Sequence, residues 1–106
     1  MEKIEKEKYG KTAPLLMEIE YHTVLRTILA GTTPGLIFVD DPNDPDVTLV
    51  RYSHHLFISG DPQAVDHQRL QAFILDKLIP DLKQADMPFF RLSASRSRWL
   101  DIFEKI

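Results

Sequence analysis

The feature that most constrains this fold is the run at residues 35–62, GLIFVDDPNDPDVTLVRYSHHLFISGDP. It contains three short segments rich in β-branched and aromatic residues, at 36–39, 47–52 and 56–59, which are typical of strands. The Asp, Asn and Pro residues at 41–46 have strong turn preferences, so they predict a hairpin between the first two strands. The first segment is apolar throughout, which predicts a strand buried on both faces.

The connection between the second and third strands is open to two interpretations. Ser53 and His54 stand where a tight turn would lie, but neither is the Gly or Asn that such turns favour. A tight turn and a single long strand with a bulge are both compatible with these residues.

Apolar residues at helical spacing lie on both sides of this run. Residues 15–29 predict a first helix, which cannot continue through Pro34. Residues 70–82 predict a long helix with a mostly apolar stripe. This helix should end or kink near Ile79, because Pro80 has no N–H to donate to the preceding turn.

The remaining segment predicts one more strand and one more helix. Residues 89–92 form a short apolar strand, and a last helix runs through Trp99 and Ile102 after a cap at Ser95 or Ser97. A strand, a long helix and a second strand make a βαβ unit, so the third and fourth strands should be parallel. The predicted fold class is therefore α+β, with antiparallel strands followed by a βαβ unit and helices packed on a mixed four-stranded sheet.

Residues 1–14 form a charged lead in which Lys and Glu alternate, with Ile4 and Tyr9 as its main large apolar side chains. Mixed charge of this kind is typical of a solvated or frayed segment rather than a binding arm. We therefore expect residues 15–106 to form a single domain around one core. No capping signal follows the last helix, so we interpret this domain as part of a longer parent chain.

The composition excludes several classes of function. A net charge of −3 gives no general attraction to phosphate backbones, which argues against nucleic acid as a partner. The chain has no cysteine, so disulfides, thiolate catalysis and cysteine-ligated zinc are excluded. No apolar run approaches the roughly 20 residues of a membrane span, and the charged N-terminus differs from a signal peptide. We expect a cytoplasmic protein without a membrane partner.

Two groups of residues suggest metal binding, and both have a simpler explanation. The Asp-rich turn at 40–46 lacks the central Gly and terminal Glu of a calcium loop, so a solvated hairpin is favoured. His54 and His55 are adjacent, so on a strand they point to opposite faces and one ion cannot readily bind both. We therefore predict no metal site, and a metal hydrolase ranks lowest among the functions considered.

Serines and arginines alternate just before the last predicted helix and form a candidate anion site. Its members are Arg91, Ser95, Arg96 and Ser97. Free N–H groups at a helix start and guanidinium groups both attract anions. Serines in this place also act as ordinary helix caps, so both interpretations stay open. The sequence identifies no catalytic residue, because no nucleophile elbow, Walker loop or dinucleotide fingerprint is present.

The run PGLIFVDDPNDPDVTLVRYSHHLFISGDP resembles the N-terminal part of a GNAT-type acetyltransferase family that includes zwittermicin A self-resistance enzymes. The similar features are a helix, a Pro-Gly, an apolar strand ending in Asp-Asp, a Pro-containing turn, further strands and a Gly-Asp-Pro junction into a helix. The resemblance covers most of residues 17–106. Family members are about twice this length, which implies that the acetyl-CoA-binding half lies outside this segment.

The resemblance also implies where a cofactor would bind. In that family the pyrophosphate of acetyl-CoA lies where a strand enters the long helix, on backbone N–H groups of a glycine-rich loop. The matching position here is residues 60–65, in which Pro62 has no N–H and Asp61 adds a negative charge. We therefore expect this chain to bind no cofactor itself, with acetyl-CoA used by the parent family.

The leading hypothesis is a non-catalytic GNAT-like N-terminal domain that supports a catalytic half, which acetylates a small-molecule amine. Its partner would be that missing C-terminal half, or a second copy in a homodimer, because the βαβ unit ends in a strand with an unpaired edge. The alternative is a stand-alone binding or dimerisation module with no enzymatic activity.

Overall fold

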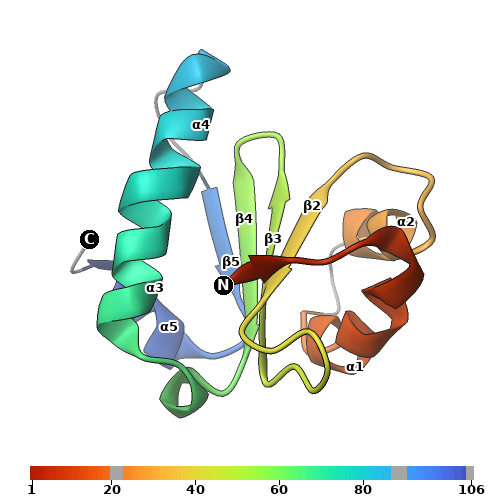
Figure 1. The fold of residues 1–106 in the computed structure, drawn as a ribbon, viewed down its shortest axis with the longest axis horizontal. Helices are drawn as coiled ribbons and strands as arrows, with labels where there is room; N and C mark the ends of the chain where they lie inside the picture. The colour runs from red at the N-terminus through yellow and green to blue at the C-terminus, as the bar shows by residue number, and fades with distance from the viewer. Residues whose placement is uncertain (20–22, 87–90, 105–106) are drawn as a thin grey trace.

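The computed structural model describes residues 1–19, 23–86 and 91–104, which form one mixed sheet with helices on both sides (Figure 1). The strands lie side by side in the order β1-β2-β3-β4-β5. Neighbouring strands from β1 to β4 are antiparallel, and β4 pairs with β5 in parallel. The predicted α+β class is confirmed. The strand bounds are Glu2–Lys3, Leu36–Val39, Val47–Tyr52, His55–Gly60 and Arg91–Ala94.

The sheet has five strands, so the predicted four-stranded sheet is wrong. The additional strand is β1, which comes from the charged lead at residues 1–14 and pairs with β2. Ile4 and Tyr9 follow it into the core, each with 5% of its surface exposed, so the lead is not a solvated segment. Backbone hydrogen bonds do not require apolar side chains, and a charged segment can therefore supply an edge strand.

The strands of the central run confirm the sequence interpretation. β2 and β3 have the predicted bounds, and the loop between them joins an antiparallel pair. Tyr52 pairs directly with His55, so Ser53 and His54 form a two-residue turn between β3 and β4. Ser53 adopts a φ of 53°, as tight hairpin turns require. The tight-turn interpretation is confirmed, and the single bulged strand is wrong.

The predicted first helix at residues 15–29 is divided in the structure. The 3₁₀ helix η1 (Lys6–Thr12) leads into the short helix α1 (Ala13–Leu16), and helix α2 (Thr23–Leu29) follows. Residues 20–22 of the predicted helix lie outside the described residues. Met17 lies within the predicted helix but is 42% exposed, whereas Ile19 is buried. The chain leaves the helix after α1, and a single helical stripe therefore does not describe it.

The long helix on the other side of the sheet is continuous through Pro80. It consists of α3 (His67–Phe73), a π-helical turn η3 (Ile74–Leu78) and α4 (Ile79–Gln84). The helix does not end near Ile79, because the wider π turn makes room for the proline ring beside the carbonyl of the previous turn. Proline here changes the helix type over one turn instead of breaking it.

The parallel strand follows this helix as predicted. β5 and β4 are in parallel register, with Leu56 opposite Leu92. The prediction placed the strand at residues 89–92, of which 89 and 90 lie outside the described residues. Two short helices complete the chain, η2 (Pro62–Ala64) after β4 and α5 (Ser97–Glu104) after β5.

Alternation of side chains divides the core into two clusters, one on each face of the sheet. Phe57 of β4 points to the first cluster, whereas its neighbours Leu56 and Ile58 point to the second. η1, α1 and α2 cover the first cluster, and the long helix and α5 cover the second (Figure 1). The prediction that β2 is buried on both faces is confirmed, since Ile37 and Phe38 belong to different clusters.

Gly60 at the end of β4 fixes the junction with the helices. Its φ of 111° favours glycine, and an added Cβ would lie 2.0 Å from the carbonyl oxygen of Asp46. Its own carbonyl accepts a hydrogen bond from the indole N–H of the buried Trp99, at 3.3 Å. The end of β4 is therefore tied to both the β2–β3 loop and α5. In the described part of the chain, every helix is too short or too polar to cross a membrane.

Candidate functional site

The Asp-rich loop between β2 and β3 is held by its own carboxylates. Asp40 accepts hydrogen bonds from the backbone N–H groups of Asp46 and Val47, each at 3.0 Å. Asp41 accepts one from Asn43 at 2.9 Å, as in an Asx turn. Within the described ranges, no group of three or more His, Asp or Glu residues is arranged to hold a metal ion. These bonds support the hairpin interpretation of the loop.

The junction between β4 and α3 uses two carboxylates as helix caps. Asp61 accepts a hydrogen bond from Gln63 N–H at 2.9 Å. Asp66 accepts from the N–H groups of Gln68 and Arg69, at 2.9 and 3.3 Å. These N–H groups are the ones that a bound phosphate would need at this place. The junction therefore offers a ligand two negative charges and few free donors.

The four residues of the predicted anion site are spread along β5 and the start of α5. Arg91 opens β5 and is exposed, and Ser95 lies four residues further, about 13 Å along an extended strand. Ser95 donates its N–H to Ile58, while its hydroxyl is buried and has no partner among the described residues. Arg96 lies 3.7 Å from a carboxylate oxygen of Glu18.

Ser97, the fourth member of that set, is exposed and begins α5. The contact of Arg96 with Glu18 is a weak surface pair, since both side chains are well exposed, and it reduces the net positive charge at the helix start without occupying all the guanidinium N–H groups. Arg91 is too far along the strand to share the same small ligand. The anion site stays a prediction, with Arg96 as its only member that the structure gives a charged partner within the described residues.

A serine–histidine pair bridges β4 and β5, and the sequence analysis did not find it. His55 Nε2 lies 2.8 Å from the hydroxyl of Ser93, and the His55 ring stacks on Phe57 with a centroid distance of 4.0 Å. A histidine within hydrogen-bond distance of a serine hydroxyl is also the arrangement of a general base and its nucleophile. Ser93 lies inside a strand, where a backbone N–H belongs to the sheet ladder and does not form an oxyanion hole. The pair therefore fits a structural link better than a catalytic one.

The outer edge of β5 is unpaired within the described residues. Arg91 and Ser95 donate their N–H groups inward to β4. Donors alternate along a strand, so the N–H groups of Leu92 and Ala94 point outward. An edge of this kind is a template for a further strand.

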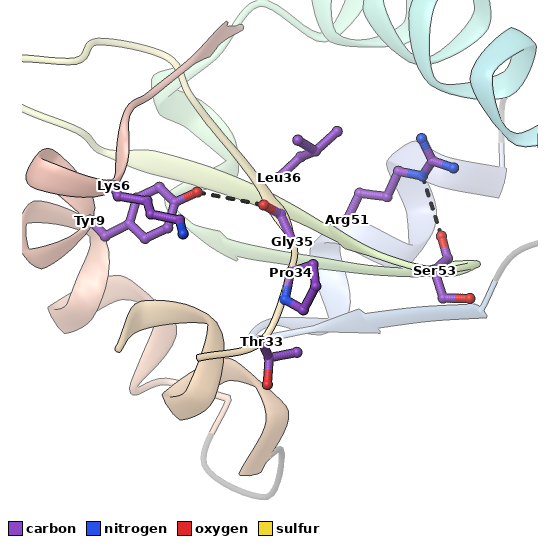
Figure 2. A pocket seen from close by; sticks show the side chains of 8 residues that line it. All are labelled: Lys6, Tyr9, Thr33, Pro34, Gly35, Leu36, Arg51 and Ser53. Carbon is purple, nitrogen blue, oxygen red and sulfur yellow. Dashed lines mark hydrogen bonds between the residues drawn. The ribbon is translucent and has the colours of Figure 1, made fainter. Parts of the chain in front are cut away.

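A groove lies at the other side of the sheet, near the start of β2 (Figure 2). It has a volume of about 410 Å³ and adjoins a second hollow of about 710 Å³. Figure 2 shows Lys6 and Tyr9 on one side of the segment at 34–36, with Arg51 and Ser53 on the other. The lining residues are Lys6, Tyr9, Thr33, Pro34, Gly35, Leu36, Arg51 and Ser53.

Close packing of α2 on β2 shapes this groove. A Cβ added to Gly35 would lie 3.0 Å from a side-chain atom of Ile28, so glycine allows α2 to approach the start of the strand. The Tyr9 hydroxyl then donates to the Gly35 carbonyl across the groove, at 3.5 Å. Sequence reasoning missed the groove because its walls come from three separate segments, at 6–9, 33–36 and 51–53. The signal was Tyr9, a large aromatic residue in an otherwise charged lead.

Comparisons with known proteins assign no family to this chain. No protein-family model matches the sequence, and no curated protein matches it.

Proposed function

We propose that this chain is a non-catalytic domain related to GNAT acetyltransferases, which supports a catalytic half that acetylates a small-molecule amine. The kinship rests on the residue run at 34–62 and on the order of elements. That order is helices, antiparallel strands, a long helix, a parallel strand and a helix, as the resemblance implies. The sheet of this domain would extend or brace the sheet of its partner.

The proposal that this domain is non-catalytic rests on the carboxylate caps between β4 and α3. In the GNAT-type family, the cofactor pyrophosphate depends on free N–H groups where β4 meets the long helix. Here Asp61 and Asp66 occupy three of those groups, and Pro62 lacks one. A phosphate would have to displace two carboxylates of its own sign, Asp61 at the start of η2 and Asp66 at the start of α3, each of which stabilises the helix that it caps. The domain therefore leaves acetyl-CoA to the catalytic half.

Isothermal titration of the purified chain with acetyl-CoA tests this proposal. We expect no saturable heat up to millimolar cofactor, because the junction lacks donors for the pyrophosphate. The backbone amide chemical shifts of Gln63 and Gln68 report on binding at this junction, and we expect them not to change. A micromolar Kd together with shifts at these two amides would overturn the proposal.

A second candidate function is a stand-alone dimerisation module, and the free edge of β5 is the observation that favours it. In this case two copies would pair β5 with β5, so that the outward N–H groups of Leu92 and Ala94 are used across the interface. Sedimentation velocity at 10–100 μM, a concentration range of the order used for weak dimers, distinguishes the two functions. A monomer throughout this range argues for the supporting domain.

The variant Ala94→Pro sharpens that test. Proline removes only an N–H that points away from β4, a position where edge strands tolerate it. It should convert any β5-mediated dimer to monomer, whereas the control Ala94→Ser keeps the N–H and the dimer. A dimer that persists unchanged in Ala94→Pro does not use this edge.

A further inference from the structure

The groove near the start of β2 is lined by positively charged side chains, although the protein as a whole is negatively charged. The chain as a whole carries a net charge of −3, yet the ionisable side chains Lys6 and Arg51 line the 410 Å³ groove without any Asp or Glu. Lys6 enters none of the ion pairs found between described residues. A concave site with one sign of charge concentrates ligands of the opposite sign. The adjoining hollow shares Lys6 but also has Glu5 and Glu7 in its lining. The attraction for anions is therefore expected in the part of the groove next to Lys6 and Arg51.

Arg51 is held in place but keeps donors for a ligand. Its side chain is only 15% exposed, and its Nε–H donates to the carbonyl of Ser53 at 3.3 Å. One terminal nitrogen lies 4.0 Å from Asp81, at the outer limit of an ion pair. A guanidinium has five N–H groups, so most of them can still reach an anion in the groove. The bond to Ser53 fixes the orientation of the group before any ligand binds.

The hydroxyl of Tyr9 is a further hydrogen-bond donor beside the groove, and its direction can change. The hydroxyl lies 3.5 Å from the Gly35 carbonyl, which is long beside the roughly 2.7–2.8 Å of an ordinary O–H···O hydrogen bond. The hydroxyl can therefore turn toward a ligand at little cost. Its ring is 5% exposed and stays packed in the core, so the hydroxyl moves on a rigid support.

The floor of the groove is apolar. Pro34 and Leu36 lie between the two cationic sides, as Figure 2 shows. Volumes of about 300–1,000 Å³ with an apolar lining and a few polar groups are typical of small-molecule sites. The combination of an apolar floor and charged sides fits an organic molecule rather than a bare inorganic anion.

We propose that this groove binds a small organic anion with an apolar body, whose charged group is attracted by Lys6 on one side of the segment at 34–36 and by Arg51 on the other. The carboxylate or sulfonate end would take N–H bonds from the guanidinium or the ammonium group, and the body would cover Leu36. This inference does not depend on kinship with acetyltransferases. The groove and the β5 edge lie on different sides of the sheet, so one can be right without the other.

The test uses two fluorescent probes that differ in one group. 1-Anilinonaphthalene-8-sulfonate has an apolar body and a sulfonate, and N-phenyl-1-naphthylamine has the same rings without charge. We expect the sulfonate to bind more tightly, and the difference to shrink as NaCl is raised. Amide shifts should change at Gly35 and Leu36. Equal affinity for the two probes, or shifts only elsewhere, would overturn the proposal.

Two substitutions assign the charge partners. Lys6→Gln and Arg51→Gln should each weaken the sulfonate about tenfold, the size of one charge-assisted hydrogen bond, and leave the neutral probe unchanged. Lys77→Gln removes a charge from an exposed residue of η3 that does not line the groove, and it should have no effect. Lys6 is exposed, so its variant keeps the test valid even if Arg51→Gln lowers stability. Unchanged binding in Lys6→Gln contradicts the assignment.

Discussion

The two faces of the sheet are covered in different ways. The second cluster is built on one long helix, which supplies Leu70, Ile74 and Leu78 from a single continuous element. The first cluster is covered by pieces of four to seven residues: η1, α1 and α2. Both clusters nevertheless contain residues with 0–5% exposure. Short irregular elements can therefore bury side chains as completely as a long helix does.

The helices on the two faces differ in how far the local sequence alone determines their structure. A long helix has its own periodicity and caps, so its sequence alone predicts it. Short pieces cannot form stable helices in isolation, and they depend on the sheet for their conformation. We expect the first face to gain its structure from tertiary contacts, and substitutions on the two faces can test this comparison.

The largest effect should come from Trp99→Ala on the face of the long helix. Trp99 has no exposed surface, and its indole N–H bonds to Gly60. Removing a buried large aromatic side chain typically lowers the free energy of unfolding by about 3–5 kcal/mol. Urea denaturation measures this loss. The control Leu100→Ala alters the next residue of α5, which is 45% exposed, and should change it by less than about 0.5 kcal/mol.

Ile4→Ala tests whether the charged lead is truly part of the first cluster. Ile4 is 5% exposed, and its N–H donates to the Ile37 carbonyl at 2.9 Å. Truncating a buried Ile should lower the free energy of unfolding by about 2–4 kcal/mol. Met17→Ala, at an exposed site on the same face, is the matched control. A cost near zero at Ile4 would show that this face is held by α1 and α2 without the lead.

The smallest of these effects is expected at the cap of the long helix. Asp66→Ala removes the acceptor for Gln68 and Arg69 N–H, which should cost about 1 kcal/mol of unfolding free energy. Asp66→Asn keeps a capping oxygen and should stay within a few tenths of wild type. Thermal unfolding of the three proteins side by side measures the difference. Equal losses in both variants would mean that the charge, rather than the hydrogen bonds, stabilises this helix start.

The sequence was sufficient to predict β2, β3, β4, the presence of the long helix and the parallel pairing of β5, for physical reasons. β2 and β3 are bounded by residues with strong turn preferences, and their apolar runs need burial on both sides. The parallel pairing of β5 followed from the length of the helix between it and β4. Each of these features depends on residues that are close in sequence.

Features that depend on distant residues could not be predicted in this way. The bond between His55 and Ser93 exists because of the register between two strands, and the residues are 38 positions apart. The groove requires Lys6 and Arg51, which are far apart in the sequence, to line the same hollow at the start of β2. The charged lead was misinterpreted because its backbone, and only two of its large side chains, attach it to the sheet. Local sequence patterns do not predict contacts between residues that are this far apart in the chain.

The π turn before Pro80 sets the phase of the long helix. Its four core residues follow each other at a strict spacing of four: Leu70, Ile74, Leu78 and Leu82. In an uninterrupted α-helix each such step overshoots a full turn by about 40°, so three steps would rotate the last residue about 120° away from the first. A π turn has more residues per turn and takes back part of this rotation. The turn that accommodates the proline therefore also brings Leu82 back toward the face of Leu70, and both side chains are buried.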